Sequence, residues 1–142
     1  MGLPLGSQEL ADEFWRLERE KDPAYLEAVQ GLNIRFLMLC LDCPGNEDRQ
    51  LALTIEDGHF TKIEVSRAPA PSSLRTVPFD HTQYDFRGAA PEHIFIDMIM
   101  GRIGMLDVLP HIKIDGDFAR LMSTVQGFMS FIAYLKNVDI VP

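Results

Sequence analysis

Residues 110–135 read PHIKIDGDFARLMSTVQGFMSFIAYL, and this stretch decides the fold. Its first part alternates in hydrophobicity, so that Ile112 and Ile114 face the same side of a short strand. A turn follows at 115–117, and apolar residues then recur at steps of three and four, which is typical of a helix. The stretch therefore predicts a strand that leads into a terminal helix.

The apolar stripe of this helix covers about five turns. Its members are Phe118, Leu121, Met122, Val125, Phe128, Met129, Ile132 and Leu135. Gly127 lies inside the stripe and costs about 1 kcal/mol relative to alanine, so we expect the helix to bend or divide there. Phe131 and Tyr134 add a second apolar flank to the final turns. Two interpretations are open: the helix is a core helix capped by neighbouring loops, or its final turns close one end of a lipid-sized cavity.

The segment 112–122, followed by Gly127-Phe128-Met129 and an aromatic-rich terminal helix, resembles the end of the sterol carrier protein type-2 lipid-binding domain. In that family an isoleucine-rich strand and a Gly-Asp pair lead into the C-terminal helices, and the likeness in element order extends over residues 25–136. The chain is most similar to a stand-alone, prokaryotic-like member. The family often has glycine where Pro110 and His111 stand, and because Pro110 lacks an N–H, the strand is expected to start at an edge or before pairing begins.

The composition predicts one soluble globular domain over residues 1–142, with residues 1–6 as a flexible tail. A chain of 142 residues is long enough to bury roughly 68% of its unfolded surface. Hydrophobic residues make up 46% and charged residues 24%, which is ordinary for such a domain. The net charge of −8 argues against nucleic acid and against stable docking on an anionic membrane, which leaves at most a transient membrane contact.

The sequence has neither a membrane-spanning pattern nor a secretory signal. It contains no run of about 18 uncharged apolar residues, and its start lacks a basic segment followed by an apolar one. A cytoplasmic location is the expectation that follows.

Two helices are expected before the first long strand. Ser7 is a suitable N-cap for a helix that carries Leu10, Phe14 and Leu17 on one face. Asp22 followed by Pro23 is a second start signal, with the aspartate as cap and the proline at the first helical position.

Residues 32–42 predict a strand that is apolar on both faces, and 49–55 predict the next strand. A strand covered on both faces is central, or lines a cavity with one of them. The turn at Glu56-Asp57-Gly58 allows two registers, and we favour a three-residue loop with a bulge, because it pairs Leu51 with Ile63 and keeps one face apolar.

The second half of the chain predicts an irregular connection at 67–81, a strand around Tyr84 and Phe86, and an apolar helix that starts at Pro91. The connection is either a plain surface loop or a flap over an opening. Together with the strand at 110–115, the order is four antiparallel strands, a helix, a fifth strand and terminal helices. We therefore expect an α+β fold: a five-stranded, mainly antiparallel sheet with helices packed on one face, enclosing an apolar cavity.

No pattern nominates a catalytic residue, a metal ligand or a cofactor site. Cys40 and Cys43 have C-x-x-C spacing, but Cys40 falls inside a strand and no second pair follows, so two reduced thiols are the expectation. The four histidines lie in separate elements and match no metal motif. An enzyme that uses the two cysteines stays the minority hypothesis.

The leading hypothesis is non-enzymatic binding and transfer of a long apolar lipid, because the apolar faces exceed what one helical layer over a sheet needs. The resemblance implies the same activity on a sterol, fatty acyl or isoprenoid ligand. The residues expected to line the cavity are Phe36, Met38, Phe86, Ile94, Met98, Ile99, Ile103, Phe128, Phe131 and Ile132. The alternative is an accessory or interaction protein that supports quinone or lipid metabolism, as a homodimer with a filled core or beside a partner enzyme.

Overall fold

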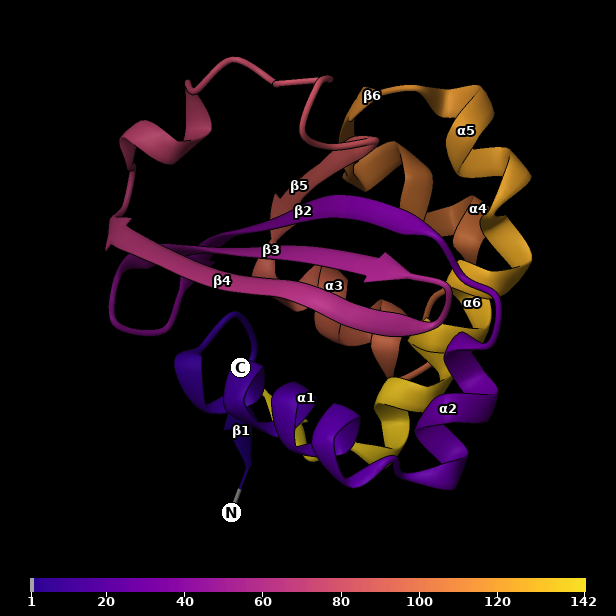
Figure 1. Ribbon diagram of the computed structural model, residues 1–142. Coiled ribbons are helices and arrows are strands. Elements are labelled where there is room, and N and C mark those ends of the chain that lie inside the picture. The colour runs from indigo at the N-terminus through magenta and orange to yellow at the C-terminus, as the bar shows by residue number, and fades with distance from the viewer. Residues whose placement is uncertain (1) are drawn as a thin grey trace.

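The computed structural model describes residues 2–142, apart from the side chains of Met105 and Leu106. Its centre is a five-stranded sheet in the order β4-β3-β2-β5-β6, with the helices gathered on one face (Figure 1). The strands are β2 (Ile34–Cys43), β3 (Glu47–Glu56), β4 (His59–Pro69), β5 (Phe86–Pro91) and β6 (Lys113–Gly116). The α-helices are α1 (Gln8–Glu20), α2 (Pro23–Val29), α3 (Glu92–Ile99), α4 (Met105–Val108), α5 (Phe118–Ser123) and α6 (Val125–Tyr134). The predicted α+β class and the five-stranded sheet are confirmed.

The first two helices start where their caps predict. The Ser7 hydroxyl accepts from the Leu10 N–H at 3.2 Å, and the Asp22 carboxylate accepts from the Tyr25 N–H at 2.9 Å. Each cap satisfies an amide that the helix itself leaves without a partner. Both helices thereby present one apolar face to the sheet.

The sheet differs from the expected antiparallel run at one pairing. Strand β5 lies parallel to β2, with Phe36 opposite Phe86 and Met38 opposite Gly88, whereas the other three pairings are antiparallel. The prediction that the fourth strand continues the antiparallel order was wrong. A parallel neighbour needs a crossover rather than a hairpin, and residues 70–85 supply it.

The β3–β4 hairpin also differs from the expected one. Asp57 and Gly58 form a two-residue turn, both with positive φ of 49° and 78°, and Glu56 pairs with His59. An irregularity in the register beside Ile55 then places Leu53 opposite Ile63. The predicted three-residue loop was therefore wrong, because the bulge that restores the apolar face lies within the strands and not in the turn.

Residues 1–6 were expected to be a flexible tail, and the described part of this segment is instead part of the fold. Strand β1 (Leu3–Pro4) pairs in parallel with β7 (Ile140–Val141) at the other end of the chain. The Leu3 N–H donates to the Asp139 carbonyl and the Leu5 N–H to the Val141 carbonyl, at 2.6 and 2.8 Å. Leu5 is fully buried in the core, which explains why the segment is held in place.

The terminal segment divides at Thr124 between α5 and α6, three residues before the glycine where we expected a break. Gly127 has a different role, since a Cβ there would lie 3.0 Å from Leu32 Cδ1, so the glycine lets α6 lie close to Leu32 in the segment between α2 and β2. Strand β6 begins only at Lys113, and Pro110 lies in the short 3-10 turn η2 (Leu109–His111) before it. This placement confirms that pairing starts after the proline.

The opposite face of the sheet is covered by the 70–85 connection, which contains the 3-10 turn η1 (Ser73–Arg75). Leu37 and Ala52 form a small second cluster with Tyr84 on that side. The fully buried Asp48 accepts from the Ser72 hydroxyl at 2.6 Å and from the Arg75 guanidinium at 2.7 Å, and these contacts hold its pKa far below the usual range. The connection is thus anchored by a buried carboxylate.

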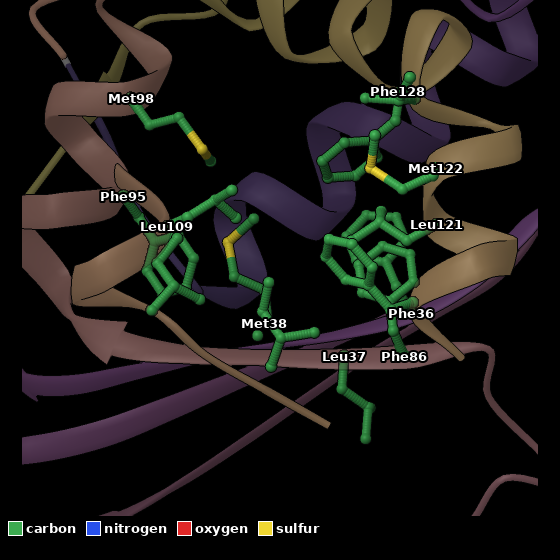
Figure 2. Close-up of a pocket in the computed structure, with 15 residues that line it drawn as sticks. Phe36, Leu37, Met38, Phe86, Phe95, Met98, Leu109, Leu121, Met122 and Phe128 are labelled. Carbon is green, nitrogen blue, oxygen red and sulfur yellow. The ribbon is translucent and has the colours of Figure 1, made fainter. Parts of the chain in front are cut away.

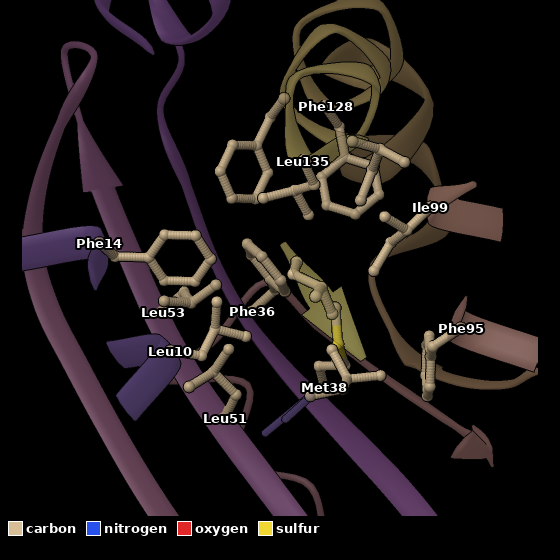
Figure 3. Packing of buried hydrophobic residues seen from close by; sticks show 14 of the residues in the cluster. Leu10, Phe14, Phe36, Met38, Leu51, Leu53, Phe95, Ile99, Phe128 and Leu135 are labelled. Carbon is tan, nitrogen blue, oxygen red and sulfur yellow. The ribbon is translucent and has the colours of Figure 1, made fainter. Parts of the chain in front are cut away.

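The core lies between the sheet and the helices, and one end of it is densely packed (Figure 3). Phe131 of α6 lies with its ring centroid 6.1 Å from Phe14 of α1 and 6.0 Å from Phe60 of β4. Tyr25 of α2 stacks on Phe60 at 5.4 Å. We call these four aromatic residues the filled end of the core. The 3-10 turn η3 (Leu135–Asn137) follows α6.

Candidate functional site

The other end of the core contains an apolar cavity of about 120 Å³ between β2, β5 and β6 on one side and α3, α5 and α6 on the other (Figure 2). We call it the hollow end. Its lining residues are all apolar: Phe36, Leu37, Met38, Phe86, Gly88, Phe95, Met98, Leu109, Ile112, Ile114, Phe118, Leu121, Met122, Val125 and Phe128. The side chain of Leu37 points away from the others, toward the opposite face of the sheet.

The floor of the cavity is hollow because one strand position carries no side chain. Met38, Gly88 and Ile114 stand side by side on β2, β5 and β6. A Cβ on Gly88 would have Ile112 Cγ2 at 3.4 Å as its one neighbour within 4 Å. Any larger residue would project into the cavity, so Gly88 sets its depth.

Three aromatic rings form one wall of the cavity. Phe36 and Phe86 stack across the parallel β2–β5 pairing at 5.6 Å, and Phe128 meets both rings edge-on at 5.3 and 5.7 Å. Edge-to-face and offset arrangements of this kind are the favoured geometries of aromatic pairs. This aromatic wall contrasts with the adaptable methionines Met38 and Met98 that line the cavity elsewhere.

The cavity reaches solvent at α5. Phe118 and Met122 line it and yet are 52% and 51% exposed, so they lie where the cavity meets water. Gly116 places the helix there: its φ is +117°, and a Cβ would lie 2.4 Å from the Asp85 carbonyl oxygen. The chain can turn from β6 into α5 at this point because the residue is glycine.

The lining of the cavity is apolar throughout and contains no acidic or basic side chain. Titratable side chains are absent from the cavity lining, and the described residues contain no group of three or more histidine, cysteine or acidic side chains that could hold a metal ion. The two free cysteines are buried in the core and do not line the cavity, and the neighbouring Cys43 thiol and burial raise the pKa of Cys40. Glu92 at the start of α3 is also buried, which raises its pKa.

The structure places five of the ten predicted lining residues along the cavity: Phe36, Met38, Phe86, Met98 and Phe128. The other five are not among the residues that line this cavity, and their contact with a ligand stays a prediction. Ile94, Ile99, Phe131 and Ile132 are buried in the core, and Ile103 packs half-buried against it. The reason is helix rotation: on α6, Phe128 faces the hollow end, whereas Phe131 turns toward Phe14 and Phe60.

The sequence interpretation missed lining residues of two kinds. Ile112 and Ile114 belong to the strand that alternation identified, and Leu121 and Met122 belong to the stripe that follows. Their positions carried the signal, but which surface they face depends on how β6 and α5 dock. Gly88 gave no local signal, because a cavity that forms over a glycine depends on its neighbours in the sheet.

Among the described residues, no helix combines the length and apolar character needed to cross a membrane. The described helices instead pack their apolar faces on the sheet. The result is a small α+β architecture, a five-stranded mixed sheet with a single helical layer and an apolar cavity between them.

This architecture is that of sterol carrier protein type-2 domains. A crystal structure of sterol carrier protein 2 matches with a TM-score of 0.69 at 17% identity, over 94% of this chain and 98% of that chain. A conserved hypothetical protein from Thermus thermophilus, with a suggested relation to sterol carrier protein, matches with a TM-score of 0.68 at 15% identity, over 99% and 96%. Sterol carrier protein 2 from Yarrowia lipolytica, in its apo form, matches at 0.52 and 12%, over 94% and 91%.

At the level of sequence, no family model matches the chain, and no curated protein matches it either. The structural matches span nearly all of this chain and of the two proteins with the higher TM-scores. The chain therefore has the sterol carrier protein type-2 fold.

Proposed function

We propose that this protein binds a long apolar lipid in the cavity at the hollow end and carries it, without catalysing a reaction on it. The observation that carries the proposal is a solvent-connected cavity whose fifteen lining residues are all apolar. Transfer of a hydrocarbon chain from water into such a space is favourable by about 0.8 kcal/mol for each buried CH₂. The names of the structural matches, sterol carrier proteins, support the same ligand class.

The size of the cavity constrains how a lipid would be held. A volume of about 120 Å³ is close to the roughly 150 Å³ of an engineered cavity that accommodates benzene, and below the roughly 300 Å³ at which drug-sized pockets begin. A long ligand would thus extend through the opening at α5, or widen the cavity. Met38, Met98 and Met122 make widening feasible, because an unbranched thioether side chain adapts to irregular space.

The orientation of the ligand follows from the lining. The cavity offers no hydrogen-bond partner to a polar headgroup, and burying an unpaired polar group costs about 1–3 kcal/mol in proteins. The apolar tail would therefore enter first, and the polar end would remain at the opening beside Phe118 and Met122. Catalysis is not part of the proposal, because the lining contains no acid, base or nucleophile.

The test is to fill the cavity from its floor. Gly88→Leu puts a branched side chain into the space above Ile112, whereas Gly88→Ala adds one methyl group at an ordinary contact distance of 3.4 Å. Excluding even two methylenes of the ligand costs about 1.6 kcal/mol, which is more than tenfold in affinity. We expect Gly88→Leu to weaken binding of a fluorescent long-chain fatty acid by more than about tenfold, and Gly88→Ala to change it little.

A second blocking variant protects the test against misfolding. Ile114→Phe enlarges the neighbouring floor residue on β6 and should weaken the same probe. Circular dichroism and urea unfolding report whether each variant is folded. Unchanged probe affinity in both folded variants contradicts the proposal, and a lipid recovered by organic extraction of the purified parent protein, and missing from Gly88→Leu, supports it.

A further inference from the structure

The outer face of α5 is an unusual part of the described surface. Among the described residues, the large apolar side chains that are exposed are Val77 at 50%, Phe118 at 52% and Met122 at 51%. Phe118 and Met122 are four residues apart and so share one side of α5, and both line the cavity opening. Exposed apolar residues are ordinary when scattered singly, and what sets this pair apart is its place at the opening of an apolar cavity.

We propose that this pair, Phe118 and Met122, docks transiently on a neutral phosphatidylcholine bilayer, so that a lipid can pass between membrane and cavity without crossing water. The inference rests on the proposed function, that the cavity takes a lipid. An apolar ligand leaving the opening would otherwise meet water at once, and contact with a bilayer removes that step. The docking itself needs no bound ligand.

The helix is held so that the pair stays outside. Leu121, between the two in sequence, is buried and anchors α5 to the protein. The Arg120 guanidinium donates to the Asn33 carbonyl at 3.0 Å, and the Asp117 carboxylate caps the helix by accepting from the Arg120 N–H at 3.0 Å. These contacts fix the inner side of α5 and leave Phe118 and Met122 free to enter an interface.

The charges favour a neutral membrane over an anionic one. The chain carries a net charge of −8, which repels an anionic surface. Around the opening the charges are engaged locally: Asp115 pairs with Arg87 at 2.9 Å, and Asp117 and Arg120 make the contacts described above. The pair is therefore an apolar patch without a basic cluster that would select acidic headgroups.

The extent of the patch argues against a second copy of the chain as its partner. A stable protein interface buries roughly 800 Å² on each side with matched shapes. Two half-exposed side chains on a six-residue helix offer far less. A bilayer interface requires no shape complementarity, and an interfacial anchor enters it by only about 5–10 Å.

The experiment places a reporter on the patch and measures contact with vesicles directly. The chain has a single tryptophan, so Trp15→Phe provides a silent background in which Met122→Trp is introduced. Vesicles of phosphatidylcholine with brominated acyl chains quench an indole that reaches the acyl boundary. We expect at least about twofold quenching for Met122→Trp, and weaker quenching when part of the lipid is replaced by phosphatidylserine.

The matched control is Val77→Trp in the same background. Val77 is equally exposed but lies in the connection over the opposite face of the sheet, where its carbonyl accepts from Arg87. It should show no quenching. The inference is overturned if Met122→Trp is not quenched, if both positions are quenched alike, or if sedimentation without vesicles shows a dimer that Phe118→Ser dissociates. None of these outcomes depends on ligand uptake. They can therefore be told apart from a failure of the proposed function, which would appear as unchanged fatty acid binding in Gly88→Leu.

Discussion

The two ends of the helix-covered face use the same kind of residue and reach opposite results. At the filled end, Phe14, Tyr25, Phe60 and Phe131 arrive from four elements and pack ring to ring at 5.3 to 6.1 Å. At the hollow end, the wall of aromatic and methionine side chains surrounds about 120 Å³ of space. In Figure 3, Phe14 of the filled end lies on one side of the view and Phe95 of the hollow end on the other.

The two ends are lined by similarly apolar residues, so the difference lies in the side chains that the covering helices place there. Helices α1 and α2 each insert an aromatic side chain against β4. The hollow end is covered in part by the short helix α5, of which only Leu121 is buried, and its floor carries Gly88. Close packing is thus concentrated at one end, and empty space at the other.

The largest expected effect comes from the same substitution at two sites on α6. Phe131→Ala removes a ring that contacts Phe14 and Phe60 at the filled end and also Phe36, and we expect a loss near 5 kcal/mol in the free energy of unfolding. Phe128→Ala removes a ring that already borders empty space, and should cost about 3 kcal/mol. Urea unfolding measures both. Equal losses would show that the two ends are packed alike.

A smaller effect is expected for the carboxylate that ties α1 to the filled end. Glu18 accepts from the Phe60 N–H at 2.6 Å and from the Tyr25 hydroxyl at 3.0 Å, and it pairs with His59. Burial by itself raises the pKa of Glu18, but the hydrogen bonds from His59, Phe60 and Tyr25 outweigh it and lower the pKa. Glu18→Gln should cost about 1.5 kcal/mol at neutral pH.

The pH dependence of this cost has a definite sign. Because the pKa is lower in the folded state, the Glu18 carboxylate stabilises the protein above its unfolded pKa of about 4.3, and that contribution is lost as pH falls through the folded value. The stability difference between Glu18→Gln and the parent should therefore shrink in acid. Glu20→Gln, an exposed site paired with Arg16, is the control and should change stability by less than about 0.5 kcal/mol. A difference that stays constant down to acid pH would contradict the assignment.

The smallest effect on stability is expected at the opening of the hollow end. Met122 is half exposed, so Met122→Ala should change the free energy of unfolding by no more than about 0.5 kcal/mol. Leu121→Ala, the adjacent and buried position, should cost about 2 kcal/mol. A large loss from Met122→Ala would mean that α5 is packed more tightly than its exposure indicates.

The sequence predicted the local features of this protein because their causes are local. The caps at Ser7 and Asp22 and the faces of β2 follow from neighbouring residues, and so does the turn from β6 into a helix after Gly116. Half of the residues predicted to line the cavity do so for the same reason: residues such as Phe36 and Met38 lie on the face that periodicity assigns to the interior. These features needed no knowledge of the rest of the chain.

Only the tertiary structure decided which apolar residues meet each other and which surround space. The parallel β2–β5 pairing and the β1–β7 ladder join segments far apart in sequence, and no local pattern specifies such partners. Ile99 and Phe131 looked like cavity residues, yet they are core, because the rotation of α3 and α6 on the sheet determines what each side chain contacts. Apolar character follows from composition, whereas a cavity is a property of how the elements pack around Gly88.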